Sequence, residues 1–220
     1  MKKNVCILML LCITLLSACG IGGGENPGNT PEPTETAAPT ETATPTETAK
    51  PTETPAALLP VSSPISLSFL SGVGAWYTDI ELQNDGSFTG SFSDTNAGEA
   101  GNGYVATIYK CDFSGKMTDI KKIGDYAYSM TLSGYETAVK PDTEEIIDEV
   151  RYIYATPYGI EGGKEFILYL PGMPVEDLPE EFVQWYPGDK ADIATPEGTL
   201  NRFGLYHVEQ EEGFYSPATL

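Results

Sequence analysis

The chain of 220 residues carries 32 Asp and Glu against 12 Lys and Arg, a formal net charge of −20. A surface this acidic repels nucleic acids and other anionic polymers, so it argues against both as direct partners. Cationic ligands, metal ions and basic proteins stay open, and solvation alone also accounts for acidic surfaces. The single histidine excludes a multi-histidine metal site.

The N-terminus has the layout of an export signal. Two lysines precede an apolar run, Val5 to Leu16, that is too short to span a bilayer. The letters "LSAC" at 16–19 then resemble the lipobox of bacterial lipoproteins, in which a diacylglycerol joins the cysteine and the signal, here residues 1–18, is removed. This resemblance implies that Cys19 anchors the mature protein to the cell membrane on its extracellular face. An ordinary secretory signal that contains a cysteine is the alternative.

Residues 19–60 are predicted to be a disordered tether. From Pro33 onward a six-residue repeat runs "PTETAA", "PTETAT", "PTETAK", "PTETPA". Proline at every sixth position blocks helix and sheet, and Thr and Glu offer no apolar surface to bury. We expect an extended, polyproline-like spacer that holds the following domain away from the membrane. Its composition also leaves O-glycosylation open.

Residues 61–220 are long enough for one domain with its own core. Once the signal is removed and Cys19 is acylated, Cys111 is the cysteine that remains, so the domain has no internal disulfide. We predict that Cys111 is a buried, unreactive thiol, and a nucleophile is the alternative.

A β-hairpin is predicted at 71–94. Residues alternate over 75–83, which places Trp76 with three further uncharged side chains on one face. The letters "NDG" at 84–86 suit a tight turn. The return limb over 87–93 carries two phenylalanines on one face, with a glycine between them that permits a bend.

The rest of the domain also has a strand pattern. Further strands are predicted at 104–113, 116–123, 126–132, 150–156, 165–172 and, as the closing strand, 198–210. A turn at Ser114-Gly115 separates the first two of these, and an acidic connection precedes the fourth. A short helix is predicted at 176–186, with Pro179 near its start. We therefore predict an all-β, antiparallel, lipocalin-like small barrel, or a sandwich, of about seven to eight strands with one short helix.

Two resemblances bear on this prediction. The letters "GAWY" at 74–77 resemble the G-x-W signature of lipocalins, where the tryptophan plugs the closed end of an eight-stranded cup. In that family a basic residue near the last strand packs across the tryptophan, and Arg202 is the matching residue here, although other lipocalin motifs are not visible. The segments "ELQNDGSFTGSFSD" and "CDFSGKMTDIKKIGDYAYSMTL" resemble a group of uncharacterised lipoproteins of Gram-positive anaerobes. That resemblance implies a lipidated tether and a β-domain, and no activity.

Four residues are candidates to line a ligand cavity. They are Trp76, Tyr128, Met130 and Arg202. Small barrels hold one small molecule when side chains leave room for it. The alternative is that these side chains simply fill the barrel.

The glycine-rich segment "DTNAGEAGNG" is a weak candidate for a metal site. Asp94, Asn96 and Glu99 supply the oxygen atoms that calcium prefers. Their spacing departs from the EF-hand pattern, and a solvated connection between strands is the alternative.

The sequence carries no G-x-S-x-G, H-E-x-x-H or phosphate-loop motif, so we expect neither catalysis nor a cofactor. The prediction is a monomeric, non-catalytic domain on a lipid anchor that binds or senses a small apolar ligand at the cell envelope. One alternative is an interaction module that contacts a basic surface protein without any small ligand. A secreted hydrolase of unrecognised type is the other.

Overall fold

The computed structural model describes residues 58–62, 64–72 and 74–219. The predicted signal at 1–18, Cys19 and the repeats of the tether lie outside the described residues. Among the residues that are described, none of the helices combines the length and the apolar character needed to cross a membrane.

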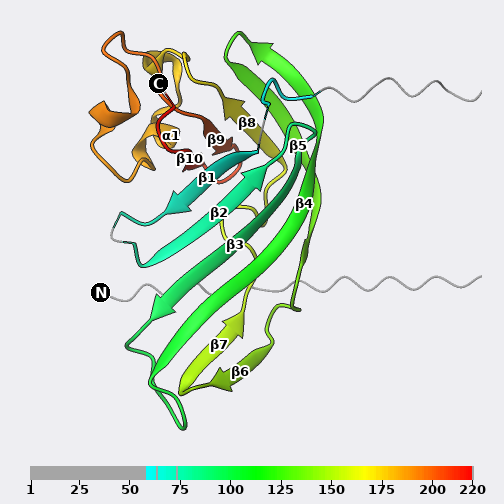
Figure 1. Cartoon of the computed structure of the whole chain (residues 1–220), viewed down its shortest axis with the longest axis vertical. Coiled ribbons are helices and arrows are strands. Elements are labelled where there is room, and N and C mark those ends of the chain that lie inside the picture. Colours follow the sequence, from blue (N-terminus) through cyan, green and yellow to red (C-terminus); the bar gives the residue numbers. More distant parts are fainter. Residues whose placement is uncertain (1–57, 63, 73, 220) are drawn as a thin grey trace, which may run out of the picture. The chain divides into compact units, whose positions relative to one another are not determined.

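Eight antiparallel strands form a closed barrel (Figure 1). In chain order they are β1 (Ile65–Leu70), β2 (Trp76–Leu82), β3 (Ser87–Asn96), β4 (Ala106–Gly124), β5 (Ala127–Thr137), β8 (Glu165–Tyr169), β9 (Gly204–His207) and β10 (Glu212–Tyr215). Around the barrel the order is β3-β2-β1-β10-β9-β8-β5-β4, and the pairing of β3 with β4 closes it. The prediction of an all-β barrel is confirmed, and the sandwich is excluded.

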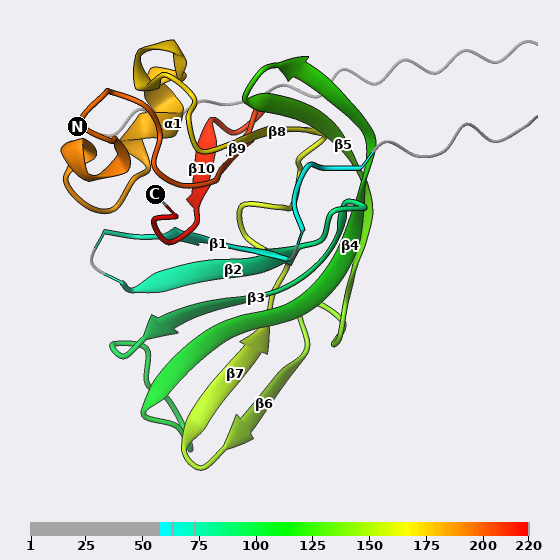
Figure 2. The same ribbon diagram turned by 45° about the horizontal axis from the view of Figure 1, so that its top comes forward.

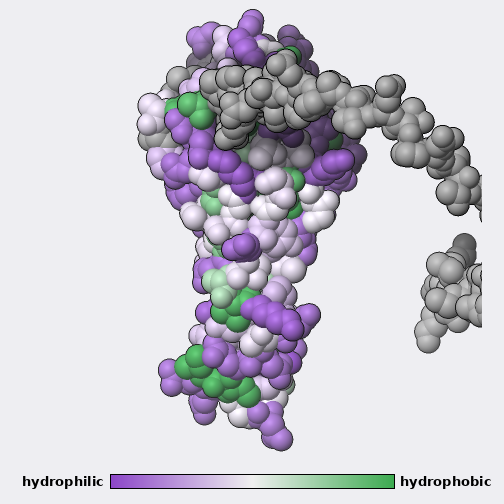
Figure 3. Space-filling view, turned by 90° about the vertical axis from the view of Figure 1, so that its right-hand side faces the viewer, coloured by the Kyte–Doolittle hydropathy of each residue, from purple (hydrophilic) through white to green (hydrophobic). Residues whose placement is uncertain are grey.

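Two further strands lie outside the barrel, and we call them the arm. They are β6 (Glu144–Ile147) and β7 (Val150–Tyr154), and β7 pairs in parallel with the start of β4. The acidic connection of the prediction is therefore partly a strand, although it is exposed along its length. Figure 3 shows hydrophobic residues gathered at the narrow end of the molecule, among hydrophilic neighbours. The arm contributes Ile146 and Ile147, both about half exposed.

The predicted hairpin at 71–94 is confirmed as β2 and β3, but another strand precedes it. In β1, Ile65, Leu67 and Phe69 alternate with serines, and these three side chains point into the core. Because the outward serine hydroxyls of β1 donate to carboxylates on β2, the polar positions of both strands are also matched. Trp76 consequently lies on the second strand rather than the first.

The turn predicted at Ser114-Gly115 is wrong. Both residues lie inside the long strand β4 and pair with β3 on one side and β5 on the other. Gly115 is needed for another reason: the ring of Phe88 packs so closely against it that a Cβ atom has no room. The glycine permits close packing across the sheet and ends no strand.

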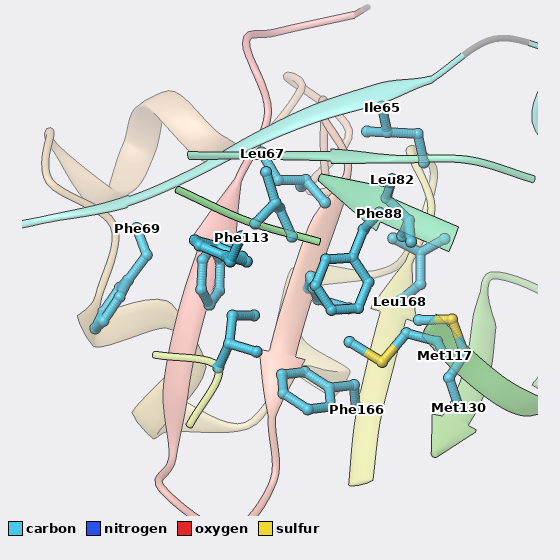
Figure 4. Close-up of a cluster of buried hydrophobic side chains, with 14 of the residues drawn as sticks. Ile65, Leu67, Phe69, Leu82, Phe88, Phe113, Met117, Met130, Phe166 and Leu168 are labelled. Carbon is cyan, nitrogen blue, oxygen red and sulfur yellow. The ribbon is translucent and has the colours of Figure 1, made fainter. Parts of the chain in front are cut away.

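Residues 155–164, between β7 and β8, enter the barrel, and we call them the plug loop. The buried hydroxyl of Thr78 donates to the carbonyl of Tyr158 at 2.8 Å, and Ile160 is completely buried. A Cβ on Gly159 would lie 2.6 Å from the ring of Phe69. The interior is therefore filled by core side chains (Figure 4) and by a segment of the chain itself.

Strands β8 to β10 separate two hydrophobic clusters. Leu205 belongs to the interior cluster, while Tyr206 points outward to a second cluster beneath residues 174–203, which we call the cap (Figure 2). The cap holds the predicted helix as α1 (Glu180–Gln184), flanked by the 3-10 helices η1 (Val175–Asp177) and η2 (Lys190–Ile193). From α1, Phe182 packs onto the two strand glycines 204 and 213, where a Cβ would collide with its ring.

The end of the chain also differs from the prediction. The closing strand expected at 198–210 is confined to β9, and its first residues belong to the cap. The final strand β10 lies further on, where it pairs with β9 and with β1.

Candidate functional site: a cleft at one end of the barrel

A cleft of about 430 Å³ opens where β2 begins and β3 ends. It is lined by Trp76, Phe92, Asp94, Tyr109, Ala155, Thr156, Tyr158 and Glu161. One wall is thus formed by β2, β3 and β4, and the plug loop supplies the other.

The strand wall follows directly from the register of the sheet. Trp76 pairs with Asp94, and Asp94 pairs with Tyr109, so the three side chains lie in one row on one face of the sheet. The next row along the strands holds Thr78, which is buried. Side chains two residues apart on a strand point to the same face. Because Thr78 points into the barrel, Trp76 and its partners Asp94 and Tyr109 also face the interior, at the end of the barrel.

Aromatic packing fixes the position of Trp76. Its ring lies 4.8 Å from Phe69 and 5.0 Å from Tyr158, with the second contact edge to face. Trp185 of the cap approaches it at 6.4 Å and donates its indole N–H to the carbonyl of Glu211 at 2.8 Å. Such contacts favour a preformed cleft, because a ligand does not have to order these rings.

The hydroxyl of Tyr109 is already engaged. It donates to Glu99 at 3.1 Å, and this hydrogen bond, together with burial and the charge of Glu99, raises the pKa of Tyr109. The same carboxylate forms an ion pair with Arg151 at 3.4 Å. The side chain of Tyr109 is thereby held by its hydroxyl, and it lines the cleft.

The three metal candidates are engaged differently, and the side-chain amide of Asn96 donates to Glu99 at 3.4 Å. Asp94 lines the cleft, Glu99 is paired with Arg151, and Asn96 accepts from the backbone N–H of Gly98. Across the described ranges, no three His, Cys, Asp or Glu residues gather as a metal site would require.

Of the four cavity candidates, the structure brings one to the cleft, Trp76. Met130 is 1% exposed within the core, and Tyr128 packs partly buried against the same cluster. Arg202 lies in the cap, with its guanidinium 4.7 Å from the ring of Tyr186 and a hydrogen bond to the carbonyl of Asp192. It therefore does not pack across Trp76, whose neighbours are aromatic.

Tyr109, Tyr158 and Glu161 were missed as site residues. Tyr109 could have been found from the strand pattern, because it lies two residues before the buried Cys111 on the same face of the strand and pairs with Asp94. The other two lie on the plug loop, which has no periodicity that could place it inside the barrel.

A cluster of polar side chains around a buried histidine lies beneath the plug loop. His207 is fully buried and stacks on Phe166 at 4.6 Å, with Nε2 3.5 Å from Glu209 and Nδ1 3.7 Å from Glu212. Within the described part of the chain, both ring nitrogens and one buried oxygen of Glu212 have no hydrogen-bond partner. Gly163 of the plug loop sits directly over Nε2.

The two glutamates of this group also contact the plug loop or its exit. Glu209 accepts the backbone N–H groups of Lys164 and Glu165; burial raises its pKa, but these hydrogen bonds outweigh burial and leave the pKa lowered. On the other side, burial raises the pKa of Tyr158, and the nearby charge of Glu212 raises it further. Glu209 therefore holds the exit of the loop that forms one wall of the cleft.

Cys111 is buried, as predicted, at 3% exposed. Burial raises the pKa of its thiol to about 11, with smaller contributions from nearby carboxylates. The thiolate needed for nucleophilic chemistry is therefore scarce at neutral pH.

No family model, curated protein or solved structure matches the chain.

Proposed function

We propose that this protein is a binding domain displayed at the cell surface, and that the cleft between the barrel and the plug loop holds a small ligand. The cleft itself is the observation that supports this. Its volume of about 430 Å³ falls in the range of roughly 300–1,000 Å³ that small-molecule sites occupy. Its lining also has the usual character of such sites, several aromatic rings with a few polar groups.

The proposal places the domain on a lipid anchor at Cys19, outside the cell membrane and at the end of the tether at 19–60. The signal and the "LSAC" letters support this. Metabolic labelling with an alkyne-tagged fatty acid tests it in the bacterial host. The wild type is expected to take up label and to fractionate with membranes, and Cys19→Ser is expected to do neither. Labelling that persists in the variant would contradict the anchor.

We propose binding rather than catalysis. The thiol of Cys111 is buried, and His207 is enclosed in the barrel, so neither faces the cleft. Asp94 and Glu161 are a pair of carboxylates such as glycosidases use, and this keeps the hydrolase alternative testable. We expect no release of nitrophenol from a panel of nitrophenyl glycosides. Hydrolysis by the wild type that is lost in Asp94→Asn would contradict the proposal and favour the hydrolase.

Ligand binding is tested with the mature lipoprotein in detergent micelles. Thermal shift against a panel of amines, sugars, fatty acids and metal ions is expected to find ligands that stabilise the wild type. Trp76→Ala is expected to abolish the shift, whereas Tyr77→Ala, on the solvent face of the same strand, keeps it. A panel without any stabilising compound, or equal shifts in both variants, would contradict the cleft as the site.

A second candidate, a protein-interaction module, is favoured by the arm. β6 pairs with β7 on one edge, and it combines exposed isoleucines with Glu144 and Glu145. Such an edge suits a basic partner that adds a strand. A peptide that alternates Lys and Ile is expected to bind, and one that alternates Glu and Ile is not. Equal binding of the two, or no loss in Ile146→Lys, would contradict this candidate.

A further inference from the structure

We infer that the ligand of the cleft is a small organic cation of the alkylammonium class. This inference rests on the proposed function, since it names the chemistry of the same site. It also differs from the small apolar ligand that the sequence predicts, because the plug loop and the core side chains occupy the interior that such a ligand would need.

The aromatic rings of the cleft come from four separate parts of the chain, β2, β3, β4 and the plug loop. Trp76 is on β2, Tyr109 on β4 and Tyr158 on the plug loop, and Phe92 lies 6.1 Å from Tyr158. Cations bind over the faces of aromatic rings, with Trp the strongest partner, and quaternary ammonium groups are bound by sets of such rings. The hydroxyl of Tyr109 is bonded to Glu99, so this polar end is satisfied before any ligand enters.

Two carboxylates complete the lining. Asp94 and Glu161 are half-buried, and in the described part of the chain neither side chain has a hydrogen bond or an ion pair. Many other acids on the barrel and arm are different: Asp85 is paired with Lys116, and Glu144 with Arg151. Partly desolvated, unpaired carboxylates beside aromatic faces attract a positive charge.

The nearby cationic side chains have other contacts. Arg151 is shared between Glu99 and Glu144, and the ammonium of Lys110 lies about 5 Å above the rings of Tyr152 and Tyr154 on the arm. Neither side chain lines the cleft. A ligand cation therefore does not compete with a lysine or arginine already in place.

The same lining argues against other ligand classes. An anion, including a fatty acid, meets two carboxylates on a chain of net charge −20. A bare metal ion lacks the clustered oxygen donors that it needs among the described residues. A neutral sugar is the closest competitor, because sugars also stack on aromatic rings and donate hydroxyls to carboxylates.

The decisive experiment compares matched probes on the wild-type lipoprotein. Choline carries a quaternary ammonium, and 3,3-dimethylbutan-1-ol has the same shape without the charge. Isothermal titration is expected to show at least about tenfold tighter binding of choline, since the charge adds cation–π and carboxylate attraction. Methyl β-glucoside is the sugar probe, and it is expected to bind more weakly than choline.

Variants then test which carboxylates attract the positive charge of choline. Asp94→Asn and Glu161→Gln are each expected to weaken choline about five- to tenfold and to leave the neutral probe unchanged. Asp112→Asn is the matched control, because this acid is exposed on β4 outside the cleft, and it should change neither. Since the pair of probes is compared first on the wild type, the inference stays testable even if a variant folds poorly.

The outcomes separate the inference from the proposed function. If the neutral isostere or the glucoside binds as well as choline and Trp76→Ala removes that binding, the cationic class is wrong and the binding cleft stands. When no probe and no compound of the thermal-shift panel binds, both are wrong. Choline binding that survives all three cleft variants would also overturn the inference.

Discussion

The two faces of strands β8 to β10 bury side chains of different character. Toward the cap, Phe182 packs among aliphatic side chains and three tyrosines, and the buried hydroxyl of Tyr215 donates to the carbonyl of Phe182. Toward the interior, the same strands bury His207 and Glu212, whose polar atoms are left unsatisfied, beneath the loop that walls the cleft. Unsatisfied buried polar groups cost stability, so their presence is typical of functional regions. The cap side of these strands is thus packed for stability, whereas the interior side keeps buried polar groups that the fold alone does not satisfy.

The largest expected effect separates stability from binding. Phe182→Ala should lower the free energy of unfolding by about 3–5 kcal/mol, because it empties the centre of the cap. Choline affinity should stay the same at a temperature where the variant is folded. Urea unfolding and titration check the two parts. If affinity falls with stability, the cap and the interior are not separate in function.

Gly159→Ala perturbs the interior instead. The glycine has φ 83°, and a Cβ there would meet both Phe69 and Phe214, so about 1–3 kcal/mol of stability should be lost. Choline binding should be lost too, because this loop carries four of the residues that line the cleft.

Gly162→Ala is the matched control for that experiment. Gly162 shares the loop and a positive φ of 73°, but a Cβ there would meet only the flexible end of Gln210. It should lose some stability from backbone strain and keep choline binding. Equal loss of choline binding in both variants would mean that the position of the plug loop inside the barrel does not determine choline binding.

Alkaline pH should weaken the cap. Burial raises the pKa of Tyr169 from 10.0 to about 12, so the folded protein holds this proton more tightly than the unfolded chain. Its contribution is complete below about pH 10 and is lost as pH rises toward 12, on the order of 2 kcal/mol. Unfolding free energies over this range, with phenolate absorbance as the probe, should show the loss. Tyr169→Phe should flatten the curve, and an unchanged curve would contradict the assignment.

The smallest effect concerns Arg202, which the lipocalin resemblance places against Trp76. Because it stacks on Tyr186 in the cap, Arg202→Lys should cost about 1 kcal/mol of stability. The fluorescence contribution of Trp76, isolated in a Trp185→Phe background, should not change. A shift in that emission would mean that the two residues contact each other after all.

Much of the barrel follows from local pattern. The alternation of β2 and the "NDG" turn predict the hairpin because one buried face sets the register. β1 was missed although its letters alternate, and β10 was missed because its four letters, EGFY, show no alternation and all four residues are buried. The turn at Gly115 was predicted wrongly because the sequence does not distinguish a glycine that makes room for a neighbouring ring from a glycine that ends a strand.

The cleft was predictable only in part. Trp76 and Asp94 were both singled out, for different purposes, and it is the sheet register that makes them neighbours. Tyr158 and Glu161 depend on a loop that enters a closed barrel, which is a long-range event without a local signal. Arg202 lay within the closing strand expected at 198–210, but the strand begins only at Gly204 and the residues before it belong to the cap.

The position of Leu59 has a consequence for how the domain is presented. Its backbone N–H donates to the carbonyl of Asn84 at the turn between β2 and β3, so the N-terminal segment joins the barrel at that end. Trp76 and Asp94 lie at the opposite ends of the same two strands, about 20 Å away for a strand of seven residues. The mouth of the cleft and the point where Leu59 meets the barrel therefore lie at opposite ends of β2 and β3.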